Sequence, residues 1–311
     1  MIRPAQPQPA HSYSKSGVLH CLSDSSLATA FKHLSEQGIL SMPVVTTNNI
    51  RFYGWLDMVD IVTYISHTFA NHAWSNEGEY TKFFNEVRSF NEATVRSAMA
   101  HKNWKTSTSH PINADCSLFH AFEMMAKSDV PRVAVLTPDR QIATIITQSM
   151  MVNYIHAHMA LLTNEARRMP VSAMLLHHHE PYLVKMTDKA LLAFQTMSEK
   201  GVTGLGVVDA HGKLVDVISA RDLRGLTIDA ASFYRLYSTV GELKDALRVN
   251  KPDTPWGLIT AQPTTTYEEI VNLLVVNKVH RVFIVDAQGT PTKCVCLSDV
   301  LLQLLVKKAE A

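Results

Sequence analysis

The stretch VHRVFIVDAQGTPTKCVCLSDVLLQLL, residues 279–305, contains a complete supersecondary pattern. It begins with the basic pair His280-Arg281 and continues as a short apolar run that turns at Asp286 and Gly289. A second run follows, and two such runs bounded by turn residues predict a pair of adjacent strands. Asp299 then opens an apolar helical pattern, 13 residues after Asp286. The unit therefore has basic side chains at one end and a carboxylate at the other.

The same outline occurs in three further segments, residues 41–65, 131–155 and 204–226. The place of Asp299 is taken in these segments by Asp60, Met150 and Asp222, respectively. Each segment is preceded by apolar residues at spacings of three and four, which predict an amphipathic helix. The repeating unit is therefore helix, strand, strand, helix. Because one such unit leaves apolar faces uncovered, the units are expected to pair.

The repeats define the predicted domain organisation and an α/β fold class. Four repeats form two pairs, residues 18–162 and residues 165–311. Residues 1–17 contain three prolines and no apolar core, so they are expected to be a disordered tail outside the fold. Apolar residues share one face of residues 79–90, which predicts an additional amphipathic helix between the first two repeats.

The bulk composition excludes several classes of protein. The chain has 311 residues, a formal net charge of +1 and no run of Lys and Arg, so nucleic acid is not an expected partner. No apolar stretch approaches the roughly 20 residues that cross a bilayer, so no membrane association is expected. Four cysteines and no Asn-x-Ser/Thr sequon favour a reduced compartment, the cytoplasm or the nucleus.

Motifs for catalysis are missing from the sequence. It has no Gly-Lys-Ser/Thr phosphate loop, no His-Glu-x-x-His and no serine elbow, so an enzyme is not expected. The glycines of residues 201–206 have the wrong spacing for a dinucleotide loop. His177, His178 and His179 are adjacent and cannot all point at one ion from regular structure, so no metal is predicted. Cys294 and Cys296 alternate on one strand, which favours packing in the core.

The repeated pattern resembles the cystathionine β-synthase (CBS) repeat, and four repeats in one chain are similar to the gamma subunits of AMP-activated protein kinase (AMPK). The resemblance is strongest in residues 279–305 and 204–226, and YSTVGELKDALR, residues 237–248, also fits. It implies a disc of two tandem CBS pairs (Bateman domains) with AMP, ADP or ATP between the repeats as regulatory ligand. It also implies two partners, a kinase catalytic subunit and a beta-type scaffold subunit.

The resemblance also implies roles for particular residues. An Asp at the start of the last helix of a repeat would hold the ribose, and these positions are Asp60, Asp222 with Ser219, and Asp299. Basic residues at the start of a strand would hold phosphates, and these positions are Arg132, His280 and Arg281. The chemistry agrees, since a carboxylate accepts two hydrogen bonds and a guanidinium donates a planar fork. The acids also fit the simpler role of helix capping, which is compatible with ligand binding.

Several positions depart from the family pattern. Met150 replaces the ribose acid of the second repeat, so that cleft is expected to be empty. Asp57 and Cys296 stand where a hydroxyl residue is expected, and basic residues are replaced by Leu40, Pro131 and Gly201. A charge-assisted hydrogen bond is worth roughly 1.5–3 kcal/mol. Losing two of them weakens binding about a hundredfold or more. One or two clefts are therefore expected to bind, using Asp222 or Asp299 with His280 and Arg281.

Two functional hypotheses follow. The first is a non-catalytic regulatory subunit that binds AMP, ADP or ATP and controls an associated kinase. The second is a free-standing CBS-repeat protein, possible as a homodimer, that binds another adenosyl ligand such as S-adenosylmethionine or acts as an interaction module without a ligand. The replaced basic residues favour the second hypothesis, because a ligand with fewer phosphates needs fewer cations.

Overall fold

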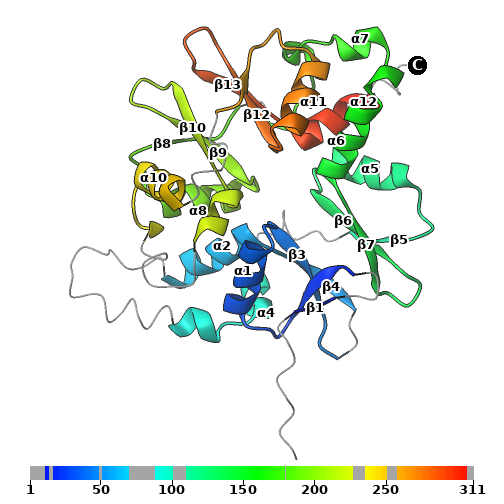
Figure 1. Ribbon diagram of the computed structural model, residues 1–311, viewed down its shortest axis with the longest axis vertical. Helices are drawn as coiled ribbons and strands as arrows, with labels where there is room; N and C mark the ends of the chain where they lie inside the picture. Colours follow the sequence, from blue (N-terminus) through cyan, green and yellow to red (C-terminus); the bar gives the residue numbers. More distant parts are fainter. Residues whose placement is uncertain are drawn as a thin grey trace, which may run out of the picture.

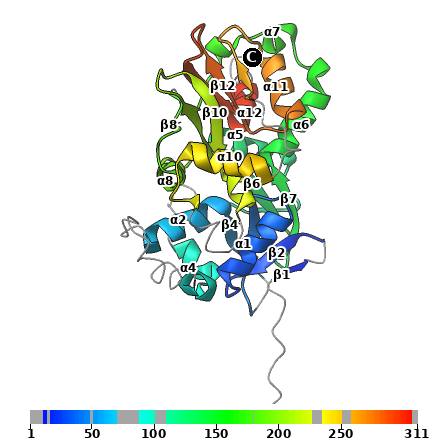
Figure 2. The same ribbon diagram turned by 60° about the vertical axis from the view of Figure 1, so that its left-hand side comes forward.

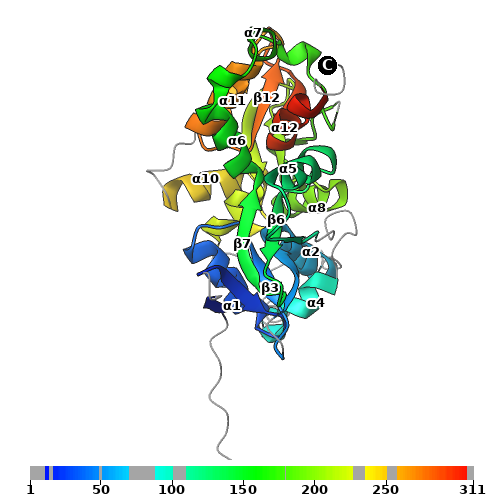
Figure 3. The ribbon, with the colours of Figure 1, turned by 90° about the vertical axis from the view of Figure 1, so that its right-hand side faces the viewer.

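The computed structural model describes residues 11–13, 17–48, 51–69, 88–100, 110–178, 180–226, 235–250 and 258–306. Four α/β units surround a common centre (Figure 1), and the view from the side is narrower, as expected for a flattened molecule (Figure 3). The α/β repeats predicted from the sequence are confirmed. Residues 79–87 of the predicted additional helix lie outside the described residues, and residues 88–90 are helical.

All four repeats have the same order of elements. Repeat 1 contains β2 (Leu19–Leu22), α1 (Leu27–Glu36), β3 (Ser41–Val45), β4 (Phe52–Asp57) and α2 (Met58–Phe69). Repeat 2 contains β5 (Ile112–Asn113), α5 (Leu118–Lys127), β6 (Arg132–Leu136), β7 (Ile142–Thr147) and α6 (Gln148–Ala157). Repeat 3 contains β8 (Leu183–Lys185), α8 (Ala190–Lys200), β9 (Gly204–Val208), β10 (Leu214–Ser219) and the 3-10 helix η4 (Ala220–Gly225). Repeat 4 contains β11 (Thr260–Ala261), α11 (Tyr267–Val276), β12 (Arg281–Val285), β13 (Pro291–Cys296) and α12 (Leu297–Val306).

The sheets also have one topology in every repeat. The first, short strand pairs in parallel with the second, which pairs antiparallel with the third. The two hairpins with Asp-Ala-x-Gly turns show how the sequence forces this geometry. Gly212 and Gly289 have φ of 79° and 85°, a left-handed conformation that favours glycine. The carboxylates of Asp209 and Asp286 accept backbone N–H groups of their own turns at 2.8–3.0 Å.

The two largest hydrophobic cores join repeats from different predicted pairs. One core combines repeats 1 and 3, where α2 packs on α8, and the other combines repeats 2 and 4, where α12 packs on α5 and α6. Smaller cores join the sheets of repeats 1 and 2, and those of repeats 3 and 4. The order around the centre is therefore 1, 2, 4, 3, which can be followed in Figure 1. The two repeats of each predicted pair contact each other through their sheets. The larger apolar cores, however, join the helices of one pair to the helices of the other pair.

Short elements connect the repeats. Helix α4 (Val95–Ala100) packs on α1 and α2, and α10 (Val240–Asn250), which follows repeat 3 in the chain, packs on α8 and η4 of that repeat (Figure 2). The segment between α6 of repeat 2 and β8 of repeat 3 contains η2 (Met159–Leu161), α7 (Asn164–Arg167) and η3 (Val171–Ala173). No helix among the described residues is long and apolar enough to cross a membrane.

The predicted disordered tail needs a correction. Strand β1 (His11–Tyr13) pairs antiparallel with β2, so this part of residues 1–17 extends the sheet of repeat 1. The physical reason is that the prolines end at Pro9, after which the backbone has N–H donors for the open edge of β2. Residues 1–10 and 14–16 lie outside the described residues.

Candidate functional site

The three predicted ribose acids form one repeated local motif. Oδ2 of Asp60, Asp222 and Asp299 accepts the backbone N–H of the residue three positions earlier, in each case at 2.7 Å. All three acids are buried. In repeat 2, the hydroxyl of Thr147 accepts the backbone N–H of Met150 at 3.2 Å instead, and the Met150 side chain is exposed. Helix capping therefore occupies one oxygen, Oδ2, of each acid. The acids differ in the partners of the other oxygen, Oδ1.

One cavity of about 150 Å³ brings together four of the predicted site residues: Ser219 and Asp222 from repeat 3, and His280 and Arg281 from repeat 4. Its polar lining also includes Thr203, Asp216, Arg221 and Lys244. Its apolar lining consists of Leu40, Val217, Leu258, Ile259 and Val279. The cavity therefore offers an apolar wall for a flat ring, a carboxylate for hydroxyl groups and guanidinium groups for anions.

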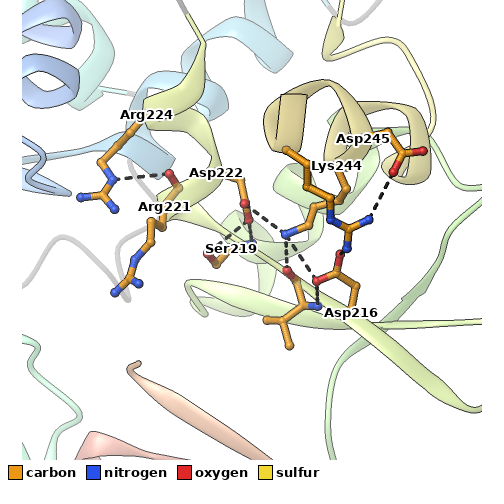
Figure 4. A network of polar contacts seen from close by, with 9 residues as sticks. Asp216, Ser219, Arg221, Asp222, Arg224, Lys244 and Asp245 are labelled. Carbon is orange, nitrogen blue, oxygen red and sulfur yellow. Dashed lines mark hydrogen bonds and ion pairs between the residues drawn. The ribbon is translucent and has the colours of Figure 1, made fainter. Parts of the chain in front are cut away.

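Lys244 is the closest charged partner of Asp222. This buried side chain comes from α10, and its Nζ donates to Asp222 Oδ1 at 3.2 Å and to the carbonyl of Val217 at 2.9 Å. It also lies 3.4 Å from Asp216, which pairs with Arg248 at 2.7 Å. Figure 4 shows the lysine between the two carboxylates. Two buried negative charges are thus balanced inside the cavity before any ligand enters.

Arg281 crosses from repeat 4 to repeat 3. Its guanidinium donates to the hydroxyl of Thr203 and lies directly over Gly204. A Cβ atom at Gly204 would lie 2.7 Å from Cζ of Arg281 and 3.0 Å from the carbonyl oxygen of Ile218. Gly204 therefore permits the close approach of the arginine.

His280 is uncharged at neutral pH. Burial of the ring, together with the charges of Arg221, Arg281, Arg132 and Arg224, lowers its pKa to about 4. Its Nε2 lies 3.5 Å from the hydroxyl of Ser149 in repeat 2. The predicted basic pair therefore contributes one fixed charge, on Arg281. An arriving phosphate would raise the pKa of His280 and favour its protonation.

Arg221 and Arg224 flank Asp222 on η4 and supply positive charge that was not predicted. Arg221 donates to the carbonyl of Lys278 at 2.7 Å, and Arg224 donates to the carbonyl of Gly38. These bonds tie η4 to turns of repeats 4 and 1. Burial and the nearby charge of Arg221 lower the pKa of Arg224. Arg221 and Arg224 therefore supply positive charge beside Asp222, while Leu40 and Gly201 carry none at the strand starts.

Asp60 and Arg132 lie outside this cavity lining. Arg132 donates to Asp57 Oδ1 at 2.6 Å and to the hydroxyl of Ser41, and its Cζ lies 5.6 Å from the ring centroid of Trp55. Asp57, which stands where a hydroxyl residue was expected, thereby neutralises the predicted phosphate ligand. This arrangement joins repeats 1 and 2 and leaves less positive charge for an anion.

Asp299 is also absent from the lining of the Asp222 cavity. Its Oδ1 accepts the backbone N–H of His177 at 2.8 Å and lies 3.0 Å from Nδ1 of the same residue. The sequence predicted that His280 and Arg281 share a cleft with Asp222 or with Asp299, and the structure has them in the lining of one cavity with Asp222. Of the other histidines, His178 packs edge-on against Tyr182 and His179 lies outside the described residues.

Comparisons with known proteins define the class. The CBS domain family model matches residues 11–67, 172–228 and 254–305, together more than half of the chain. The chain therefore belongs to the CBS-domain family. Repeat 2 lies outside these matches, but its topology shows that it is the same unit.

Within this family, the chain is similar to gamma subunits of 5'-AMP-activated protein kinase. The subunit from Kluyveromyces lactis is 24% identical over 277 residues, which cover 88% of this chain and 80% of the relative. The Saccharomyces cerevisiae subunit is also 24% identical and covers 88% and 82%. The fold matches a Methanocaldococcus jannaschii protein described as an archaeal homologue of g-AMPK, with a TM-score of 0.69, 16% identity and coverage of 96% and 98%. The chain is thus a regulatory CBS protein and not an enzyme.

Proposed function

We propose that the chain binds an adenine nucleotide (AMP, ADP or ATP) in the Asp222 cavity and regulates an associated protein kinase. The observation that carries the proposal is that one cavity gathers Ser219, Asp222, His280 and Arg281 from two different repeats. Its apolar wall suits an adenine ring, and Asp222 suits a ribose hydroxyl. Arg281, with Arg221 nearby, suits the phosphate group. The similarity to kinase gamma subunits supports the same ligand class.

Calorimetric titration of the full chain with AMP, ADP and ATP tests nucleotide binding. Asp222→Asn removes a charged acceptor, so we expect AMP to bind roughly tenfold or more weakly. Asp245→Asn is the matched control, because this neighbouring acid on α10 is mostly exposed. Arg281→Met should weaken AMP binding by a similar factor and leave adenosine binding unchanged. Absence of binding for all three nucleotides at millimolar concentration, or full affinity in Asp222→Asn, would overturn the proposal.

Affinity purification tests the regulatory role. Recovery of a kinase catalytic subunit and a beta-type scaffold subunit with the chain is the expected result. Recovery of a homodimer alone would reject kinase control and favour a free-standing CBS-repeat protein. The same preparation can then be titrated with S-adenosylmethionine, which carries no phosphate and should be insensitive to Arg281→Met.

A further inference from the structure

A segment that precedes repeat 3 covers the acid of repeat 4. Residues 175–177, here called the latch segment, lie against α12. The backbone N–H of Leu175 donates to the side chain of Gln303 at 2.9 Å, and His177 contacts Asp299 Oδ1 through both its backbone N–H and its imidazole. Leu176 packs on the core of repeats 2 and 4. The segment is therefore attached by three polar contacts and one apolar contact.

The latch segment takes the oxygen that a ribose would need. Oδ2 of Asp299 is engaged by the backbone N–H of Cys296, as in the other repeats. Oδ1 already has two contacts from His177, and the Asp299 side chain is only 3% exposed. A carboxylate oxygen has about two lone-pair sites, so both sites of Oδ1 are occupied and Oδ2 keeps one. A ribose diol donates two hydrogen bonds, so it must displace His177 to bind Asp299 with both of its hydroxyls.

The latch segment is held by an incomplete contact. The imidazole Nε2 of His177 is buried and has no hydrogen-bond partner in the described structure. The hydrogen bond to Asp299 raises the pKa of His177, and the charge of Asp129 in repeat 2 acts in the same direction. Protonation would strengthen the contact to Asp299 but leave a buried N–H without an acceptor. The contacts of His177 with Asp299 therefore stabilise the position of the latch segment on α12. The unpaired Nε2 reduces this stabilisation, so the segment can also leave.

We propose that Asp299 belongs to a latent ribonucleotide site that the latch segment closes, and that the segment must leave α12 before a ribose can bind. The inference rests on the proposed function, because the ligand class is the same as for the Asp222 cavity. It predicts that the unmodified chain binds one nucleotide, in the Asp222 cavity, and that a second site becomes available when the latch contacts are removed.

The test is the stoichiometry of AMP binding by the full chain. The double variant His177→Ala, Gln303→Leu removes two of the three polar contacts and should raise the stoichiometry from one to two. Adding Asp299→Asn to it should return the value to one. His178→Ala is the matched control and should leave the value at one. A stoichiometry of one in the double variant, or loss of a site from the otherwise unmodified chain on Asp299→Asn, would overturn the inference.

Amide hydrogen exchange tests the latch without any nucleotide. The N–H groups of Leu175 and His177 should be protected in the unmodified chain, and Asp299→Asn should increase exchange of the His177 N–H at least tenfold. Unprotected amides in the unmodified chain would overturn the latch itself. If these amides are protected and no variant binds AMP, the proposed function and the latent ribonucleotide site fail, while the closed contact stands.

Discussion

Replacing Lys244 with Met removes the cation between two buried carboxylates. The side chains of Lys244 and Asp222 are 4% and 7% exposed, so solvent screens their pairing little. Asp216 retains Arg248 at 2.7 Å, whereas Asp222 retains, among the described residues, the hydrogen bonds from the backbone and hydroxyl of Ser219. The main loss is therefore one uncompensated buried charge. Breaking a buried pair from one side costs about 3–5 kcal/mol, and we expect Lys244→Met to lower the free energy of unfolding by that amount.

Urea unfolding followed by tryptophan fluorescence measures the effect. Lys32→Met is the matched control, because Lys32 pairs with Glu36 across an exposed helix face with side chains 64% and 53% exposed. It should change stability by less than about 0.5 kcal/mol. Asp222→Asn in the Lys244→Met background should recover part of the loss, since the amide removes the orphaned charge. A cost below about 1 kcal/mol for Lys244→Met, or no recovery, would refute the assignment of Lys244 as the counter-charge of Asp222.

Two further predictions concern the centre of the molecule. Because the pKa of His280 lies near 4 in the folded state, the unfolded chain binds the proton more tightly, and stability falls as the pH decreases from about 6.5 to about 4. His280→Gln should reduce that fall by about 3 kcal/mol, and an NMR titration of His280 near 6.5 would contradict it. Arg132→Met should cost about 1.5–3 kcal/mol in urea unfolding, because Asp57 loses a largely buried partner. Arg96→Met, which breaks the exposed pair with Asp24, is its control, and equal costs would contradict the prediction.

The repeated unit was predictable because its signals are local. The spacing between the turn and the acid is set by one strand and the start of one helix, so it recurs wherever the unit recurs. Asp60, Asp222 and Asp299 were found in this way, and each one accepts the same backbone N–H. Repeat 2 shows that this outline survives without the acid, since Thr147 caps the helix instead.

The partners of the acids were not predictable, because they come from other parts of the chain. Lys244 is 22 residues from Asp222, and His177 is 122 residues from Asp299. A signal for Lys244 did exist, since it lies four residues after Val240 and three before Leu247, on the apolar face of α10. A lysine there is expected to have a buried partner. His177 gave no such signal, because a run of three histidines in a loop is equally consistent with solvent exposure.

The order of the repeats around the centre was likewise beyond local patterns. Every repeat exposes an apolar sheet face and an apolar helix face, so each can pack on two neighbours. Chain order favours the pairing of successive repeats, and the sheet contacts obey it. The helix contacts instead join repeats 1 and 3, and repeats 2 and 4. Residues of three repeats can therefore meet in one cavity, as Leu40, Asp222 and Arg281 do.

Residues from other positions replace part of the positive charge that the family pattern places at the strand starts. Of the basic positions at the strand starts, Arg281 is the one that brings positive charge to the Asp222 cavity. Leu40 and Gly201 carry no charge, and His280 is neutral. The cavity nevertheless contains Arg221, and Lys244 cancels carboxylate charge that would repel a phosphate. A ligand gains from binding only what exceeds the intramolecular contacts that it replaces. At Asp222 a sugar would share the acid with Lys244, whereas at Asp299 it would have to displace His177. We therefore expect the two acids, although they occupy the same place in homologous repeats, to bind the proposed nucleotide with different affinities.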